Sequence, residues 1–562
     1  PHPRRRRRRN ALAIAAAVAV IGGGTGVAVT LSGGGSGRSR AAAAHRPAGP
    51  AVAAAANGHP SSTNRAGDGV ITVEMTNNLG THYRVAIHDL RRAGPFVTLD
   101  VALTCQSKYC FPSIDFAAPG PALAGEGAFN GLGLIDTVGG AEYQPVADSQ
   151  GRSYSSRMVD LDDGQTEAAW ATFAAPPSSE TAMDLVIDGG GTWAPAVPIT
   201  EVGAPNSARW GSGVIAAHPV PFDVGPDATT SAGLTLPVLT LSSTVGNPRG
   251  NDNQSGDKAT ITLNADVLFA FGQATLSPPA QQILQGVAAR LKSAGRGAVN
   301  VSGYTDSIGD DSVNIPLSQA RAQAVTDALT PLTAGAPITF GATGMGSANP
   351  VSPNTNSDGS DNPAGRAANR RVTITYTVSA PTPPTPPAAA PPPAATSSAN
   401  HSVEVTINEP DLNTSYAYTV AASRLVRSGR YVVLEGTITC DNETPTRSAG
   451  CDSSYALAAS SGSTVVPPQP DFNIGTAGTS LNTDAFYTAS GVYLVDPTGQ
   501  QYIAVRNPSD KVLTAAFPTS FTASDPFAVW EYFPAPPPSV TSMNVVMPGG
   551  SPVIANVPIV SG

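Results

Sequence analysis

A long internal repeat constrains the fold of this chain more than any other feature. Two windows of thirty residues, which begin at Trp170 and Trp530, align without a gap, and fourteen of their thirty positions are identical. Upstream of these windows, Tyr83 and Tyr418 each precede a cysteine by 22 residues. Such self-similarity indicates duplicated structural units. We therefore predict two copies of one module, at residues 69–223 and 402–562.

Each copy has the periodicity of β-strands. Apolar side chains recur at every second position in several stretches, for example at Val97, Leu99, Val101, Leu103 and Cys105. Strands with one buried face, separated by turns rich in Gly, Pro and Asp, are typical of an antiparallel β-sandwich. We predict a sandwich for each module, although the pattern does not give the order of its strands.

The four cysteines follow the duplication. They allow three pairings, and the repeat favours Cys105–Cys110 and Cys440–Cys451, because each copy then carries its own bridge at the end of the same strand. Zinc is the alternative, but no histidine is near both pairs. We predict two disulfides, which an oxidising compartment permits, and no metal site.

The N-terminal residues indicate export. The run Arg4–Arg9 precedes Ala11–Leu31, which contains no charged residue. A helix of that length spans about 31 Å, close to the hydrocarbon thickness of a bilayer, and the arginines would stay in the cytoplasm. We expect residues 1–31 to form a single-pass membrane anchor, with the rest of the chain outside the cytoplasm. A cleaved signal segment, with an exported body, is the alternative.

Composition and motifs exclude several classes of function. The 32 basic residues, six of them in the N-terminal run, stand against 41 acidic ones, which argues against a nucleic-acid surface. The sequence contains no G-x-S-x-G, H-E-x-x-H or phosphate-binding loop. We predict a protein that is not an enzyme and that needs no cofactor.

Linkers separate three structured regions. Residues 32–68 have the composition of a flexible linker, 224–256 connect the first module to a middle domain at 257–378, and 379–401 are rich in Pro and Ala. A stiff polyproline-type segment extends about 3.1 Å per residue. We therefore expect the second module to be held apart, and the first module and the middle domain to move together.

The middle domain alternates strands and helices in the order β-α-β-α-β-β. Apolar stretches predict strands, and Ser277 with Pro278 predicts a helix N-terminus. The expected strands are Ala265–Phe271, Val299–Tyr304, Ile338–Thr343 and Val372–Thr377, and the two helices carry their apolar residues within 283–291 and 317–329. Helices on one face of a mixed sheet would bury both kinds of element.

Motifs in this domain carry a family resemblance. Gly303–Gly309 reads GYTDSIG, Leu317–Ala322 reads LSQARA, and Asn369–Ile374 reads NRRVTI. In this order they resemble the OmpA-like peptidoglycan-binding domain, over about 120 residues. The resemblance implies an α+β domain between the two homologous β-sandwich modules, whose own family it does not identify.

The resemblance also implies a ligand, the diaminopimelate side chain of the peptidoglycan stem peptide. In the family, the aspartate and the arginine of the first two motifs grip this zwitterion, and these roles fall on Asp306 and Arg321. An ammonium and a carboxylate need one acidic and one basic partner close together, and arginine offers a bidentate fork. Asn314 would brace the loop or bond ligand amides. Thr305 and Arg371 complete the candidate set.

These observations favour a non-catalytic cell-envelope protein that binds peptidoglycan and links the membrane to the cell wall. The alternative is a surface adhesion or receptor-type protein. In that case the duplicated modules would bind a protein or glycan partner, and the OmpA-like domain would serve only as the wall anchor.

Overall fold

The computed structural model describes part of the chain. The described residues are 64–65, 71–76, 81–112, 128–149, 151, 153–156, 158–187, 193–201, 233–378, 401–409, 414–440, 451–452, 492–509, 511–515, 520–521, 527–547 and 553–562. Most of them lie in β-strands, and few lie in helices. The candidate membrane anchor at 11–31 and the linkers at 32–68 and 379–401 fall almost wholly outside these residues. Of the helices that are described, none has the length and apolar character needed to cross a bilayer.

The first module consists of two groups of strands around one core. The first group runs antiparallel in the order β2 (Ile71–Thr76), β3 (His82–Ala93), β4 (Phe96–Cys105) and β10 (Thr166–Ala174), with β1 (Asn64–Arg65) beside β2. The second runs β12 (Trp193–Glu201), β11 (Ala182–Ile187), β6 (Leu132–Asp136), β7 (Ala141–Tyr143) and β14 (Val238–Thr240). The end of β12 joins the two groups by pairing with β3 in parallel. Apolar side chains of both groups form one buried cluster.

The second module repeats the order of eight of these strands. Its first group is β21 (Ser402–Glu409), β22 (Thr414–Ser428), β23 (Tyr431–Cys440) and β28 (Phe527–Pro534). Its second group is β30 (Val553–Ser561), β29 (Ser542–Val546), β25 (Tyr493–Val495) and β26 (Gln501–Arg506). The end of β30 again pairs in parallel, here with β22. The repeat in the sequence is therefore a repeat of strand order.

Six further strands are only two residues long. They form the pairs β5 (Tyr109–Cys110) with β9 (Leu161–Asp162), β8 (Ala147–Asp148) with β13 (Leu234–Thr235), and β24 (Cys451–Asp452) with β27 (Ser520–Phe521), of which all but one partner lie within a module. The exception is β13, which lies in the segment that follows module 1. Together with β14 it attaches the start of the connecting segment to the first module.

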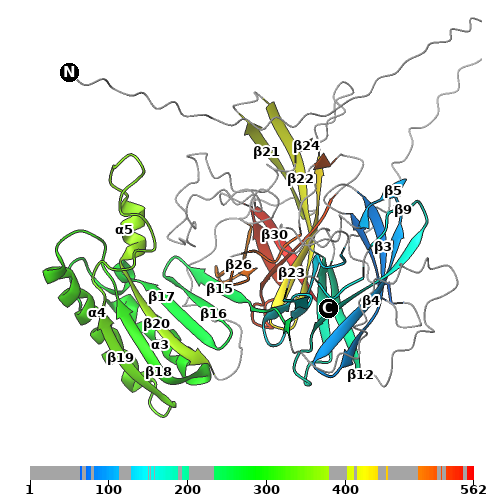
Figure 1. Ribbon diagram of the computed structural model, residues 1–562. Coiled ribbons are helices and arrows are strands. Elements are labelled where there is room, and N and C mark those ends of the chain that lie inside the picture. Colours follow the sequence, from blue (N-terminus) through cyan, green and yellow to red (C-terminus); the bar gives the residue numbers. More distant parts are fainter. Residues whose placement is uncertain are drawn as a thin grey trace, which may run out of the picture. The chain divides into compact units, whose positions relative to one another are not determined.

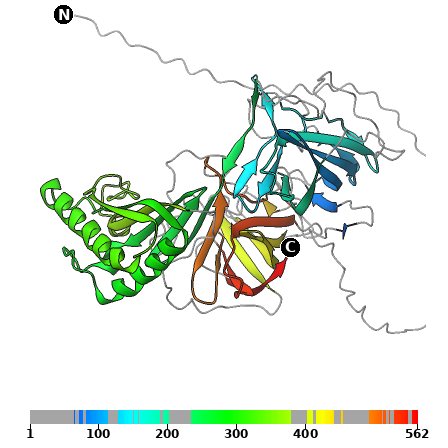
Figure 2. The same ribbon diagram turned by 90° about the horizontal axis from the view of Figure 1, so that it is seen from below.

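The middle domain has a mixed sheet with two long helices on one face (Figures 1 and 2). The sheet order is β19 (Ile338–Gly344), β18 (Gly295–Gly303), β20 (Arg371–Val378) and β17 (Lys258–Asn264), and only β18 and β19 are parallel. Helices α3 (Pro278–Ala294) and α4 (Asp311–Leu332) share one apolar core with the alternate residues of these strands. Helix α3 begins as predicted, because Ser277 Oγ accepts the N–H of Ala280 at 3.3 Å.

One predicted strand of this domain is wrong. Residues 265–268 form the short helix α2 (Ala265–Leu268), and the strand is β17, which ends one residue earlier. Asn264 explains the difference, because its side chain accepts the N–H of Asp266 at 2.9 Å and so caps a helix turn. A further short helix, α5 (Pro363–Asn369), precedes β20 and was not foreseen.

A hairpin joins the middle domain to the second module. Strand β15 (Ser242–Asn247) pairs with β16 (Gly250–Ser255), β16 pairs with β17, and β15 pairs on its other side with β26. Inside this connection Arg290 Nε of α3 donates to the buried carboxylate of Asp252 at 3.2 Å. The connecting segment is thus part of a continuous sheet.

The expectation of a separate second module is wrong, because the two modules contact each other directly. Trp193 Nε1 of the first module donates to Glu435 at 3.1 Å, and Tyr532 of the second donates to Asp184 at 2.8 Å. Ile135 and Val186 of the first module belong to the core cluster of the second. The composition of a linker limits only how far apart two modules can lie. Contacts between the module faces determine where the modules pack.

Cys105 and Cys110 lie as the duplication predicts, with their Sγ atoms 2.02 Å apart. The side chains of Cys440 and Cys451 lie outside the described residues, and their pairing stays a prediction. We expect peptide mapping of oxidised protein to find Cys105 linked to Cys110, and the double substitution to Ser to cost about 2 kcal/mol of stability. A peptide that links Cys105 to Cys440, or alkylated thiols at both positions, would contradict this.

Glu167 makes stability depend on pH. Its buried carboxylate accepts the N–H of Val159 at 3.2 Å, and burial raises the pKa of Glu167 to about 7. Because this pKa lies above the unfolded value, the folded state holds the proton longer, and stability falls as pH rises from about 4.5 to 7. We expect wild type to lose about 3 kcal/mol relative to Glu167→Gln over this window in urea titrations. A difference that stays constant with pH would exclude this effect.

Candidate functional site

Asp306 lies near the junction of β18 and α4, and Arg321 lies in the middle of α4. Asp306 lies in the loop between Gly303, where β18 ends, and Asp311, where α4 begins, and Arg321 lies on α4. Both side chains are largely buried, with exposed fractions of 7 % for Asp306 and 3 % for Arg321. Burial lowers the pKa of Arg321, and the nearby carboxylates oppose this shift. The structure therefore brings the two predicted residues into one electrostatic site.

Asp306 is held by an arginine other than Arg321. Arg370 Nη1 donates to Asp306 Oδ2 at 2.7 Å, and the N–H of Ile308 donates to Asp306 Oδ1 at 3.1 Å. The same guanidinium forms a fork on Asp266, with Nε 2.9 Å from Oδ1 and Nη2 2.5 Å from Oδ2. The hydrogen bonds to Asp266 and then to Asp306 raise the pKa of Arg370. Arg370 thus fixes the orientation of both carboxylates.

Arg321 keeps part of its guanidinium available. Its Nε donates to the carbonyl oxygen of Gln273 at 2.9 Å, and its Cζ lies 5.2 Å from the ring centre of Phe269. These contacts fix the plane of the guanidinium. Within the described residues its two Nη nitrogens donate to no protein acceptor. A carboxylate brought to the site would find both of these donors.

Asn314 and Thr305 shape the loop. Asn314 Nδ2 donates to the carbonyl oxygens of Ile308 at 3.1 Å and Gly309 at 3.0 Å, and therefore braces the turn before α4. The N–H of Thr305 donates to Gly346 O at 2.8 Å, and its hydroxyl donates to the carbonyl oxygen of Asp306. Asn314 was expected either to brace the loop or to bond ligand amides, and its Nδ2 braces the loop.

Arg371 does not bond to Asp306. Its guanidinium stacks on Tyr304, with Cζ 3.7 Å from the ring centre, and donates to the carbonyl oxygens of Asn369 and Asn349. Adjacent residues at a strand start point to opposite faces, so only one arginine of the pair can reach Asp306. The sequence does not say which one, and it gives no signal for Asp266, whose role depends on the short helix α2.

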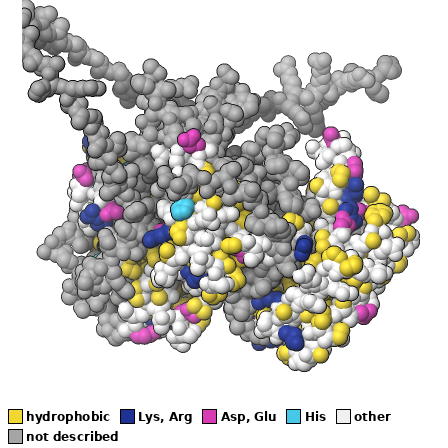
Figure 3. Space-filling view, turned by 180° about the vertical axis from the view of Figure 1, so that it is seen from behind, with side chains coloured by type: hydrophobic (Ala, Val, Ile, Leu, Met, Phe, Trp, Pro, Cys, Tyr) yellow, Lys and Arg dark blue, Asp and Glu magenta, His cyan; other side chains and the backbone are white. Residues whose placement is uncertain are grey.

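The assembled site therefore contains two carboxylates and two guanidiniums, those of Asp266, Asp306, Arg321 and Arg370. Such a set can bind a group that carries both charges. Among the described residues no cluster of His, Cys, Asp or Glu has the grouping needed for a metal ion. On the face seen in Figure 3, basic side chains are scattered rather than gathered into one broad patch.

Comparison with known proteins gives matches to the middle domain. The model of the OmpA family matches residues 268–363. The "Probable lipoprotein YiaD" of Escherichia coli is 42 % identical over 123 residues, which are 22 % of this chain and 52 % of that protein. "Outer membrane protein P5" of Haemophilus influenzae is 44 % identical over 92 residues, 16 % of this chain and 26 % of that one. The chain thus spans about half or less of the length of these relatives.

Among solved structures, the cell wall anchor of the T6SS from Pseudomonas aeruginosa is 32 % identical. The match covers 23 % of this chain and 88 % of that one, with a TM-score of 0.20. These comparisons do not identify the family of the two flanking modules.

Proposed function

The chain carries an OmpA-family domain at residues 268–363, and from this premise we propose that it is a non-catalytic cell-envelope protein that binds peptidoglycan. The ligand is the free end of diaminopimelate, which carries one ammonium and one carboxylate. The domain provides the specific contact with the wall. This contact holds the two modules at the wall.

The two Nη donors of Arg321 are the observation that carries the proposal. They are fixed in direction by the contacts of Nε and of the guanidinium face, and they have no protein acceptor within the described residues. A ligand carboxylate supplies the missing acceptor in bidentate geometry. The ammonium then lies toward Asp306, whose carboxylate Arg370 already holds in place.

The relatives support an envelope location, since they are named as a lipoprotein and as outer membrane proteins. We propose that residues 1–31 anchor the chain in the cell membrane and that 32–68 tether the body flexibly to it. We propose the remaining boundaries as given above, with the first module at 69–223, the wall-binding domain at 257–378 and the second module at 402–562.

Two kinds of peptidoglycan test the proposed ligand. Lysine at the same stem position keeps the ammonium but lacks the side-chain carboxylate. In sedimentation with purified walls, we expect the chain without residues 1–31 to bind the diaminopimelate form at least about tenfold more tightly than the lysine form. Equal affinity for the two walls would refute recognition of the zwitterion, and no binding to either would refute the proposed function.

A further inference from the structure

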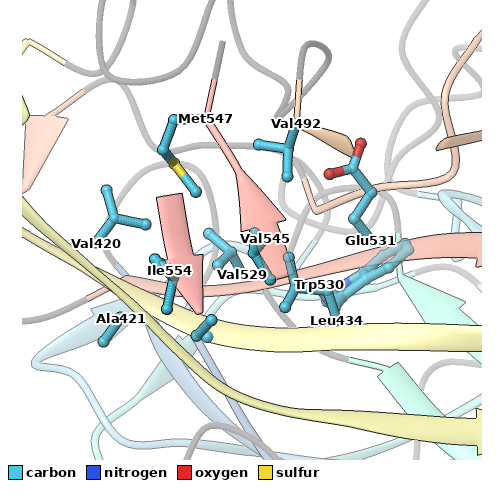
Figure 4. A pocket seen from close by; sticks show the side chains of 12 residues that line it. Val420, Ala421, Leu434, Val492, Val529, Trp530, Glu531, Val545, Met547 and Ile554 are labelled. Carbon is cyan, nitrogen blue, oxygen red and sulfur yellow. The ribbon is translucent and has the colours of Figure 1, made fainter. Parts of the chain in front are cut away.

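The pocket in the second module is too small for a ligand (Figure 4). It lies between the two groups of strands, and its volume of about 20 Å³ has room for about one water molecule. Protein interiors are normally packed in this way, with few voids larger than water. A partner of this module would therefore contact its surface rather than this pocket.

The first module carries exposed aromatic rings beside its disulfide. Strands β5 and β9 form a short ribbon at one end of the module (Figure 1), in which Tyr109 pairs with Asp162 and Cys110 with Leu161. Cys110 and Leu161 belong to the buried core, whereas Tyr109 is 55 % exposed and Phe111, the residue after β5, is 43 % exposed. Single exposed apolar residues are ordinary on a protein surface. Two aromatic rings only two residues apart form a patch.

Acidic side chains lie beside these rings. Cross-strand partners have Cβ atoms about 4.5–5.5 Å apart, so Asp162 is next to Tyr109, and Asp160 stands one residue beyond Leu161 as Phe111 stands one residue beyond Cys110. The exposed charged residues here are Lys108, Asp160, Asp162 and Asp163. Nζ of Lys108 lies 5.2 Å from the ring centre of Tyr109. The ribbon thus combines aromatic faces with an excess of negative charge, and one ring already has a cation over it.

The ribbon is held firmly on the module. The disulfide ties β5 to Cys105, where β4 ends. The N–H of Cys105 donates to the carbonyl oxygen of Gln165 at 2.9 Å, and the N–H of Gly164 donates to the carbonyl oxygen of Cys105 at 3.0 Å. These bonds attach the turn after β9 to the same strand end. A partner that contacts a fixed ribbon loses less free energy to the ordering of the protein.

The second module has the same ribbon without these side chains. There β24 pairs with β27, and Cys451 lies opposite Phe521 as Cys110 lies opposite Leu161. Counted from these partners, the equivalents of Tyr109, Phe111, Asp160 and Asp162 include no aromatic residue and one acid; they are Gly450, Asp452, Ser520 and Thr522. The pairing of the strands therefore needs neither the rings nor the three acids. Their joint presence in one copy indicates contact with a partner.

We propose that the β5–β9 ribbon of the first module binds an extended basic segment of a partner protein, with lysine or arginine at every second position. Each cation lies over the ring of Tyr109 or Phe111 and pairs with the neighbouring aspartate. Every second residue of an extended peptide recurs after about 6.6 Å, and the two rings are also two residues apart along the chain. A glycan fits less well, because carboxylates only accept hydrogen bonds and a neutral sugar leaves their charge without a partner.

Two short peptides test the need for positive charge. In the first, arginine alternates with serine, and in the second, citrulline replaces each arginine and keeps its shape without its charge. The protein is the chain without residues 1–31, because the run Arg4–Arg9 would compete. In calorimetric titrations at low ionic strength we expect the arginine peptide to bind about tenfold more tightly. Equal binding of both peptides, or saturable binding of a chito-oligosaccharide in place of the arginine peptide, would overturn the proposal.

Substitutions of the rings locate the contact. Tyr109→Leu combined with Phe111→Leu keeps apolar side chains but removes both aromatic faces, and should weaken the arginine peptide about tenfold. Each exposed contact of a cation with a ring contributes about a factor of two to five. Tyr109→Phe keeps the ring and should change affinity by less than about twofold. Unchanged affinity in the double variant, shown to be folded by circular dichroism, would place the peptide elsewhere and overturn the assignment.

Charge-matched pairs of variants separate the ribbon from the overall acidity of the chain. Asp162→Asn should weaken the arginine peptide about two- to fivefold, whereas Asp358→Asn, at an exposed position of the middle domain, should not. Lys108→Met removes the cation over Tyr109 and should strengthen binding, whereas Lys292→Met, at an exposed position of α3, should not. If both members of each pair change affinity alike, the peptide responds only to net charge and the proposal fails.

Discussion

Asp306→Ala and Arg321→Ala are each expected to weaken binding to diaminopimelate-type walls by about 10- to 100-fold. A hydrogen bond to a charged group contributes about 1.5–3 kcal/mol, and each 1.4 kcal/mol is a factor of ten in affinity. In each alanine variant, one charged group of the bound zwitterion has lost its partner in the protein. The other charged group keeps its partner. Sedimentation with purified sacculi over a range of wall concentrations measures the change.

The control for this experiment is Asp358→Ala. Asp358 is an exposed acid of the same domain that bonds to Ser360 rather than to the site. Its removal changes the net charge as Asp306→Ala does, so a purely electrostatic effect of the domain would appear in both variants. Wild-type wall retention by folded Asp306→Ala and Arg321→Ala would show that another surface binds the wall.

Trp193→Ala is expected to lower the free energy of unfolding by about 3–5 kcal/mol, the usual cost of deleting a large buried aromatic. Trp193 has no exposed surface, donates to Glu435, and packs edge-on against Tyr532 with ring centres 5.9 Å apart. The substitution leaves a void between the modules and a buried carboxylate that has lost one donor. Chemical denaturation measures the loss.

Tyr109→Ala is the matched control, since this aromatic residue of the same module is 55 % exposed. Its substitution should change stability by no more than about 0.5 kcal/mol. If Trp193→Ala is equally mild, the contact between the modules contributes little to stability in solution.

The contact between the modules is not symmetric, although the modules are copies. The face of module 2 that covers module 1 carries Tyr532 and Val433, and the equivalent positions of module 1 carry Thr172 and Thr98, whose hydroxyl groups lie 3.3 Å apart. If both modules carried the same pair of complementary faces, further modules could add to each end without closing a ring. Such an interface would risk the formation of filaments. The two threonines make this face of module 1 more polar than the equivalent face of module 2.

Local signals in the sequence were sufficient where neighbouring residues determine the structure. Ser277 with Pro278 located the start of α3, and the spaced motifs led to Asp306 and Arg321 in one site. The strand predicted at 265–271 failed because the cap formed by Asn264 outweighs the apolar pattern. Arg370 was not separated from Arg371, since adjacent residues differ only in the face to which they point, and that is set by the register of β20.

Contacts between distant faces could not be predicted in the same way. Trp530 is buried and lies beside Tyr532 on the strand whose face meets the first module, whereas its copy Trp170 is only half-buried. Both copies have tryptophan at this position, but the residues that surround it differ between the copies. Periodicity tells which side of a strand is apolar, but not which other face covers it.

The hairpin between the middle domain and the second module has a mechanical consequence. If the domain is held by the wall while the modules are pulled, tension passes through β16 and β15 into β26. The hydrogen bonds of an antiparallel ladder lie perpendicular to the strands. A force along the strands therefore loads all of these bonds at once, whereas a force across the strands breaks the bonds one after another. The ladder between β15 and β26 has a break in register after Ser242, whereas the ladders on both sides of β16 have none. Under load we expect the sheet to yield first at β15–β26, where the register is broken.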